Sequence, residues 1–200
     1  AFVSPLFGSI SELPQGAVVG SSSLRRRAQL ALRRPDLHLV EFRGNVQTRL
    51  KKLEDGVAVA TFLAMAGLSR LGMLDVARGA VDPDEMLPAV AQGCIGVERR
   101  ADDARSSAML AAIADHDSAL RMAAERAFLA RLDGSCQTPI AGLAVLRGDR
   151  LHLRGEILRP DGSEVIAGER EGPARDGAAM GTDLANELRA RAPADFFDWG

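Results

Sequence analysis

Short apolar runs alternate with longer amphipathic stretches through the first 85 residues, and this alternation limits the possible folds more than any other feature. The apolar runs occupy residues 17–20, 37–42 and 57–64. Each is followed by apolar residues at helical spacing, and the first two helices have cap residues: serines before Leu24, and Asn45. Strands that alternate with helices pair in parallel through right-handed crossovers, so we predict an α/β domain.

The last hundred residues have a different pattern. We expect helices at 97–113, 117–134 and 176–191, some strand character near 96, and three strands at 140–148, 150–160 and 162–171. Gly148-Asp149 and Pro160-Asp161-Gly162 are turn sequences between these strands. Turns this short favour antiparallel pairing. We therefore predict a small α+β module from about residue 116 to the end of the sequence.

Positive charge is concentrated in one segment. Nine basic and two acidic residues lie between Gly20 and Lys52, a local charge of +7 in a chain of net charge −2. Such a field indicates an anionic partner. Arg25 and Arg26 oppose the helix dipole in a first turn, and an anion bound there would explain them. Four other basic residues lie late in their helices, where they complement the dipole and need no ligand: Arg33, Arg34, Lys51 and Lys52.

The two cysteines differ in their neighbours. Cys94 lies among apolar residues and is expected in the core, whereas Cys136 has Gly, Ser, Gln, Thr and Pro around it. Local chemistry leaves two interpretations of Cys136: a small buried hydrophobe, or an accessible loop thiol that acts as nucleophile or attachment point. Neither cysteine has metal-ligand spacing, so no metal site is expected. Isolated cysteines and the lack of a ~20-residue apolar run indicate a cytoplasmic protein without a membrane partner.

Five segments, in the same order, resemble the porphobilinogen deaminase (hydroxymethylbilane synthase) family. They are VVGSSSLRRRAQL at 18–30, FRGNVQTRLKKLEDG at 42–56, AMAGLSRLG at 64–72, LPAVAQGCIGVE at 87–98 and ERAFLARLDGSCQTPIAG at 125–142. Three positions depart from the family's pattern. Ala91 replaces the first glycine of its GQG and is expected to stiffen a hinge, Ser135 replaces the glycine before the cysteine, and Val59 replaces an aspartate.

The resemblance implies a domain organisation. Residues 1–88 would form a three-layer α/β domain that resembles a lobe of the periplasmic binding proteins, and residues 116–200 an α+β domain with a three-stranded antiparallel sheet for cofactor attachment. Residues 89–115 would be a crossover belonging to a further, first domain. In the family that domain carries the acid–base aspartate in an HSxKDxP segment, which this sequence lacks. We therefore assign no catalytic residue here and expect the chain alone to be inactive.

The resemblance also implies a function in heme biosynthesis. The family condenses four porphobilinogen molecules into hydroxymethylbilane with release of ammonia, on a dipyrromethane cofactor held by a thioether. By resemblance, Cys136 would carry the thioether, and the remaining cofactor contacts would be Ser23, Arg25, Arg26 and Arg43. The substrate contacts would be Arg49, Arg70 and Gln92. The expected partners are porphobilinogen and the growing pyrrole oligomer, and the full-length protein is expected to be a cytoplasmic monomer.

Two other functions remain as alternatives. A non-catalytic α/β protein could use arginines at strand ends to hold a dicarboxylate, but such a protein would not need Cys136. A nucleic-acid-binding protein could use the basic segment. Aromatic residues make up only 4% of the chain and none lies between Arg25 and Arg27, so base stacking is poorly supported.

Overall fold

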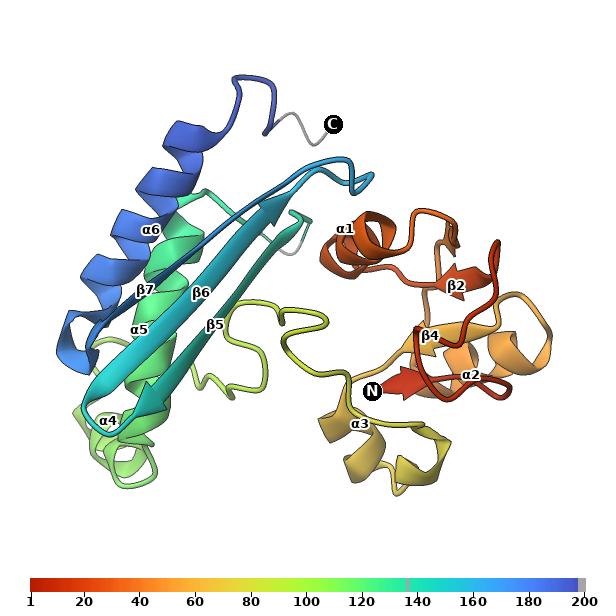
Figure 1. Ribbon diagram of the computed structural model, residues 1–200. Coiled ribbons are helices and arrows are strands. Elements are labelled where there is room, and N and C mark those ends of the chain that lie inside the picture. Colours follow the sequence, from red (N-terminus) through yellow and green to blue (C-terminus); the bar gives the residue numbers. More distant parts are fainter. Residues whose placement is uncertain (136, 198–200) are drawn as a thin grey trace.

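The computed structural model describes residues 1–135 and 137–197, which form two packed units with separate sheets and cores (Figure 1). We call residues 1–88 the N-terminal unit, residues 116–197 the C-terminal unit, and residues 89–115 the connecting segment. The N-terminal unit contains a four-stranded sheet, and the C-terminal unit a three-stranded one. The fold is thus a mixed α/β arrangement followed by an antiparallel α+β arrangement, as the sequence predicts.

The sheet of the N-terminal unit is mixed. Strand β2 (Val18–Gly20) pairs in parallel with β3 (His38–Val40) and with β4 (Ala60–Phe62), which confirms the three predicted strands and their crossovers. A fourth strand, β1 (Phe2–Val3), pairs antiparallel with β4, so the sheet order is β1-β4-β2-β3. Sequence periodicity missed β1 because two residues are too few to show a period.

The helices of this unit begin where the cap residues predict. Helix α1 (Leu24–Arg33) has Ser23 as N-cap, and α2 (Val46–Glu54) has Asn45, whose side chain accepts from the Thr48 N–H at 2.8 Å. Gly56, with φ +73°, terminates α2. Helix α3 (Met65–Arg70) and the short 3₁₀ helix η1 (Leu74–Val76) follow β4.

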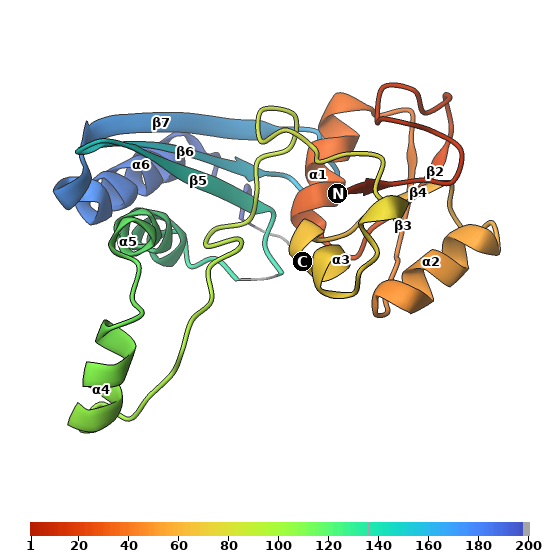
Figure 2. The ribbon, with the colours of Figure 1, turned by 90° about the horizontal axis from the view of Figure 1, so that it is seen from below.

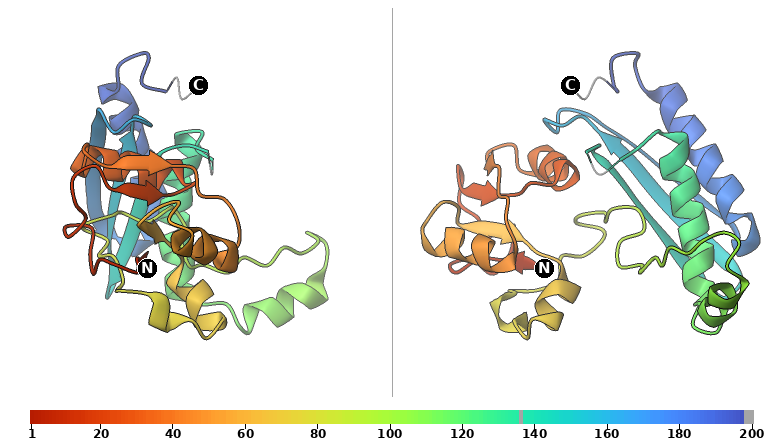
Figure 3. Two further views of the ribbon diagram at one scale, coloured as in Figure 1. Left: turned by 90° about the vertical axis from the view of Figure 1, so that its right-hand side faces the viewer. Right: turned by 180° about the vertical axis from the view of Figure 1, so that it is seen from behind.

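Three long strands form the sheet of the C-terminal unit. They are β5 (Ile140–Arg147), β6 (Arg150–Leu158) and β7 (Val165–Pro173), antiparallel in chain order. Helices α5 (His116–Arg131) and α6 (Gly177–Arg191) lie side by side on one face, and the 3₁₀ helix η2 (Ala174–Asp176) leads into α6 (Figure 3). Phe128 of α5 is fully buried against Gly155, where any side chain would overlap its ring. The predicted strands, turns and helices are confirmed here.

The connecting segment corrects three expectations. No strand forms near residue 96, and the helix expected at 97–113 is limited to α4 (Ala104–Ala111), capped by Asp103. Cys94, expected in the core, is exposed. The physical reason is the path of the chain: residues 93–100 are exposed as they lead away toward α4, which stands apart from both sheets (Figure 2), so apolar neighbours such as Ile95 and Val97 do not form a core. No helix within the described ranges is both long and apolar enough to cross a membrane.

Candidate functional site

The carboxyl ends of β2, β3 and β4 form one edge of the N-terminal sheet, where ligands of open α/β sheets bind. Gly20 ends β2 directly beneath the Phe42 ring, which leaves no room for a Cβ. The Ser22 hydroxyl accepts from the Phe42 N–H at 3.2 Å, and the Thr61 hydroxyl donates to the Gly20 carbonyl at 2.7 Å. These contacts tie the three strand ends together, so the corners that follow them are held rigidly.

Arg26 and Arg49 are two neighbouring cations at this edge of the sheet. Arg26 Nη1 donates to the Phe62 carbonyl, the last residue of β4, at 2.9 Å. Burial lowers the pKa of Arg26, and the neighbouring positive charge of Arg49 lowers it further. Arg49 Nε is itself buried and has no hydrogen-bond partner in the described part of the chain. Two guanidinium groups that share a partly buried place repel each other, and an anion would satisfy both.

Ser23 and Arg25 lie beside this pair at the start of α1. The Ser23 hydroxyl accepts from the Arg26 N–H at 3.4 Å as a helix cap. The Arg25 side chain is directed elsewhere, because its Nη1 donates to the Leu87 carbonyl at 2.6 Å. Burial lowers the pKa of Arg25 to about 10, Arg26 adds to the decrease and Glu156 opposes it. Arg25 therefore faces the junction with the C-terminal unit.

The other predicted site residues are more exposed. Arg43 follows β3 with 83% of its side chain accessible, and its Nε donates to Glu41 at 2.7 Å. Arg70 is exposed in the last turn of α3. Gln92 is exposed in the connecting segment and lines a cavity of about 690 Å³ between that segment, α4 and α5. The structure thus places Ser23, Arg26 and Arg49 near the strand ends, and Gln92 away from them in the cavity beside α5.

Cys136 lies outside the described residues. Its neighbours form a local network in which the Thr138 hydroxyl accepts from the Ser135 N–H at 2.9 Å and donates to the Ser135 carbonyl at 2.8 Å. The Leu158 N–H donates to the Pro139 carbonyl at 3.0 Å. This bond attaches Pro139 to the end of β6.

Sequence reasoning missed two buried polar residues that hold the chain where it passes from the N-terminal unit into the connecting segment. Gln29 in α1 is fully buried, and its side-chain amide bonds both backbone groups of Leu87. Its Nε2 donates to the Leu87 carbonyl at 2.9 Å and its Oε1 accepts from the Leu87 N–H at 2.8 Å. Glu125 in α5 accepts from the N–H groups of Ala91 at 2.6 Å and Ala144 at 2.7 Å, and burial raises its pKa. A polar residue on the apolar face of a predicted helix, as Gln29 is, could have indicated such a role.

Comparisons with known proteins match both units. The family model described as "Porphobilinogen deaminase, dipyromethane cofactor binding domain" matches residues 1–108, and "Porphobilinogen deaminase, C-terminal domain" matches residues 119–190. The chain is 87% identical over 199 residues to the porphobilinogen deaminase of Paracoccus denitrificans, with all of this chain and 64% of the relative aligned. It is 51% identical to that of Nitrobacter hamburgensis and 52% identical to that of Nitrobacter winogradskyi, with 98% of this chain and 62% of each relative aligned. The chain therefore spans less than two thirds of the length of these relatives.

Proposed function

Since the chain belongs to the porphobilinogen deaminase family, we propose that it forms part of an enzyme that joins four porphobilinogen molecules head to tail and releases ammonia. The product would be the linear tetrapyrrole hydroxymethylbilane. One structural observation supports this most strongly: Arg26 and Arg49 lie close together at the strand ends, and the buried Arg49 Nε has no partner among the described residues. Each pyrrole of the substrate carries an acetate and a propionate, the groups that such a pair binds.

The same residues fit the dipyrromethane cofactor of the family. Arg26, Arg49 and the Ser23 corner would hold its carboxylates, with Arg43 at the rim and Arg25 contributing from the junction. Cys136 would supply the thioether. When bound, dipyrromethane would supply a pyrrole α-carbon as the point of chain growth. A guanidinium that is already desolvated binds carboxylate more strongly than an exposed one, since the local dielectric is low.

The contribution of this chain is binding and alignment. As the oligomer grows, carboxylates accumulate, and unpaired carboxylates in one place repel each other. Paired with arginines, they would align each incoming porphobilinogen and lower the entropic part of the barrier. Arg49, Arg70 and Gln92 are our proposed substrate contacts. The acid–base carboxylate would come from the part of the relatives' length that this chain does not span.

The finer organisation is also a proposal. We assign residues 1–88 to a domain like a periplasmic-binding-protein lobe, residues 89–115 to a crossover that completes the acid–base domain, and residues 116–200 to the cofactor-attachment domain. The two family matches support separate N-terminal and C-terminal modules. The exposed apolar side chains of α4 and of the segments on either side of it support the crossover, because Ile95, Met109 and Ile113 are more than 60% accessible. We expect the full-length enzyme to be a cytoplasmic monomer.

The test compares two cysteine variants of the full-length protein. Wild type should be heavier than its sequence by one dipyrromethane and should colour with an acidic aldehyde reagent for α-free pyrroles. Cys136→Ser should lose both signals, because a serine hydroxyl is far less nucleophilic than a thiolate at neutral pH. Cys94→Ser is the matched control and should keep both, since Cys94 is exposed and contributes little packing. An adduct that survives in Cys136→Ser and disappears in Cys94→Ser would contradict the assignment.

A further inference from the structure

The turn between β6 and β7, residues 159–164, reaches from the C-terminal unit to the backbone of α1 (Figure 1). Gly162, with φ +75°, lies at the contact. A Cβ built on Gly162 would be 2.5 Å from the Leu32 nitrogen, 2.6 Å from the Ala31 Cβ and 2.8 Å from the Ala28 carbonyl oxygen. Two of these atoms belong to the helix backbone and cannot move aside. The turn therefore meets α1 closely enough to require glycine.

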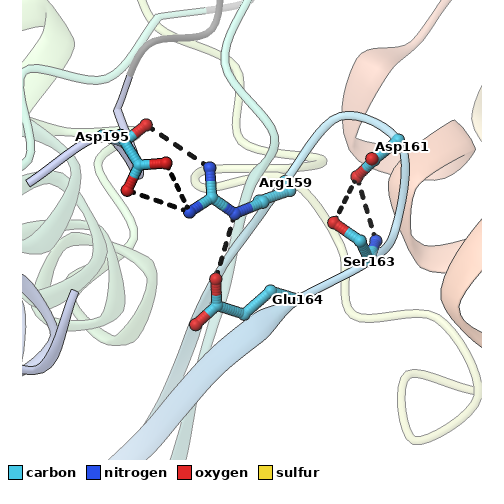
Figure 4. Close-up of polar contacts among 5 residues, drawn as sticks. All are labelled: Arg159, Asp161, Ser163, Glu164 and Asp195. Carbon is cyan, nitrogen blue, oxygen red and sulfur yellow. Dashed lines mark hydrogen bonds and ion pairs between the residues drawn. The ribbon is translucent and has the colours of Figure 1, made fainter. Parts of the chain in front are cut away.

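Hydrogen bonds among its own residues hold the backbone of this turn in place. Asp161 Oδ1 accepts from the Ser163 N–H at 3.0 Å and from its hydroxyl at 2.7 Å (Figure 4). The Gly162 N–H donates to the Arg159 carbonyl at 2.9 Å. The Arg159 N–H in turn donates to the Glu164 carbonyl at 2.9 Å. Each of these bonds fixes the backbone of the turn, so its tip presents one conformation to α1.

Asp195 and Phe196, which follow α6, also hold the base of the turn. Arg159 Nε donates to Glu164 at 3.0 Å, and its Nη2 lies 3.2 Å from both oxygens of Asp195 (Figure 4). The guanidinium also stacks over the Phe196 ring, 5.1 Å from its centre. An arginine that bonds two carboxylates and also packs on an aromatic ring holds its partners in a fixed geometry. The base of the turn is thus attached to residues 195–196.

The two sides of this contact carry the two parts of the proposed site. Helix α1 bears Ser23, Arg25 and Arg26 at its N-terminal end, and its C-terminal half meets Gly162. On the other side, Leu158, next to Arg159, donates to the Pro139 carbonyl and so holds Pro139 in place. The turn therefore links the arginines of α1 to Pro139, which comes three residues after the proposed attachment cysteine in the sequence.

We propose that the β6–β7 turn is a spacer that sets the position of Pro139 relative to the arginines of α1, with Gly162 as a positioning residue. This inference rests on the proposed function. Carbon atoms pack at ~3.5–4 Å, so a Cβ at position 162 would push the turn back by about 1 Å. A shift of that size is enough to misalign a bound reactant. The added methyl would thus change substrate binding without touching the substrate.

Gly148, in the β5–β6 turn, offers a matched control. Its φ is +61°, close to that of Gly162, but a Cβ there would meet nothing within 4 Å. Gly148→Ala and Gly162→Ala therefore bear a similar backbone strain in a hairpin turn, and differ in the contact with α1. In cofactor-loaded full-length enzyme, Gly162→Ala should raise the KM for porphobilinogen by about tenfold. Gly148→Ala should keep its KM within about twofold of wild type. A loss of folded protein alone would lower kcat per total protein and leave KM unchanged.

A readout independent of activity uses the 200-residue chain. Backbone amides in residues 28–34 should exchange hydrogen faster in Gly162→Ala than in Gly148→Ala, because docking of the turn protects them. Equal KM values and equal exchange in the two variants would overturn the inference. A wild-type full-length protein without dipyrromethane or activity would instead overturn the proposed function, while hydrogen exchange would still decide whether the turn docks on α1.

A second pair of variants serves if Gly162→Ala does not fold. Arg159→Gln adds no atoms and removes the contacts that hold the turn. Arg150→Gln is its control and removes a more exposed pair, Arg150 with Glu171 at 2.8 Å, at the other end of β6. Arg159→Gln should raise KM in the same direction as Gly162→Ala, by a smaller factor. A KM for Arg159→Gln equal to that of Arg150→Gln would overturn the spacer role.

Discussion

The arginines at the edge of the N-terminal sheet and those beside the C-terminal sheet have different partners. In the C-terminal unit Arg170 bonds to Asp183 at 2.7 Å and to Glu187 at 2.6 Å, and Arg159 is similarly paired. In the N-terminal unit Arg25 and Arg26 donate to backbone carbonyls, and Arg49 Nε is buried without a partner among the described residues. Paired charges support a scaffold, whereas buried cations without carboxylates are ready to receive an anion. The C-terminal unit is thus built for stability, and the edge of the N-terminal sheet for binding.

The largest expected effect concerns the scaffold. Phe128→Ala should destabilise the chain by about 3–5 kcal/mol, since Phe128 is fully buried at the centre of the C-terminal core. Urea unfolding followed by circular dichroism would measure it. Leu6→Ala is the control, because Leu6 is 69% exposed and should change stability by less than about 0.5 kcal/mol. Similar losses for both would show that the C-terminal unit is not the stabilising one.

The next effect concerns binding. Arg49→Met should weaken binding of the pyrrole carboxylates by about 10–100-fold, the value of a hydrogen bond to a charged group, while leaving the unfolding free energy unchanged or slightly higher. Removing the charge relieves the repulsion with Arg26. Cofactor content and KM in the full-length enzyme, with urea unfolding of the chain, would measure the two quantities.

Arg34→Met is the control for that prediction. Arg34 donates to the carbonyls of Ile10 and Leu13 and to Asp36, so this variant should lower the melting temperature and leave binding intact. If Arg49→Met lost stability and Arg34→Met lost binding, the contrast between structural and binding arginines would be reversed.

A smaller effect concerns the junction between the units. Ala91 has φ +60°, a left-handed conformation that costs a residue with a Cβ about 1 kcal/mol. Ala91→Gly should therefore stabilise the chain by about 0.5–1 kcal/mol, after the entropy that glycine adds to the unfolded state. Gly93→Ala, at φ +88° with open space around it, should have the opposite sign. Thermal unfolding would report both, and a destabilised Ala91→Gly would show that another contact outweighs the strain.

The smallest effect is a pH dependence at the same junction. Glu156 is 9% exposed, its Oε1 has no hydrogen-bond partner among the described residues, and burial raises its pKa against the opposing charges of Arg33, Arg25 and Arg154. A carboxyl whose pKa is higher in the folded state binds its proton preferentially there. The stability that this protonation contributes is therefore fully present below the unfolded pKa, and it is lost as pH rises through the folded pKa.

Glu156→Gln removes this titration. The variant should have a higher melting temperature than wild type at pH 7.5 and a similar one at pH 4, where Glu156 is already protonated. Glu164→Gln, in the β6–β7 turn, should instead remove the charge from its bond with Arg159, weaken that bond and melt lower at pH 7.5. A wild-type advantage over Glu156→Gln at pH 7.5 would mean that the three arginines outweigh the cost of burial.

Much of the fold was predictable because its signals are local. The caps Ser23 and Asn45 and the two hairpin turns each act over three or four residues, and the structure confirms them. The antiparallel pairing followed from the short turns between the three strands. The environment of Cys94 was wrongly predicted, because an apolar neighbourhood in sequence becomes a core only if the chain folds back over it. The connecting segment leads away toward α4 instead.

For the site, the sequence by itself determined where cations gather: the basic segment and the strand ends placed Arg26 and Arg49 at one edge of the sheet. Only the tertiary structure decided which of them stays without a partner. It turned Arg25 toward Leu87, 62 residues away, and set Gln29 against the same residue. It also brought Gly162 onto α1. The reason is physical: a cap or a turn depends on residues within hydrogen-bonding reach along the chain, whereas the partner of a buried polar group depends on which distant segment the packing of the two units brings beside it.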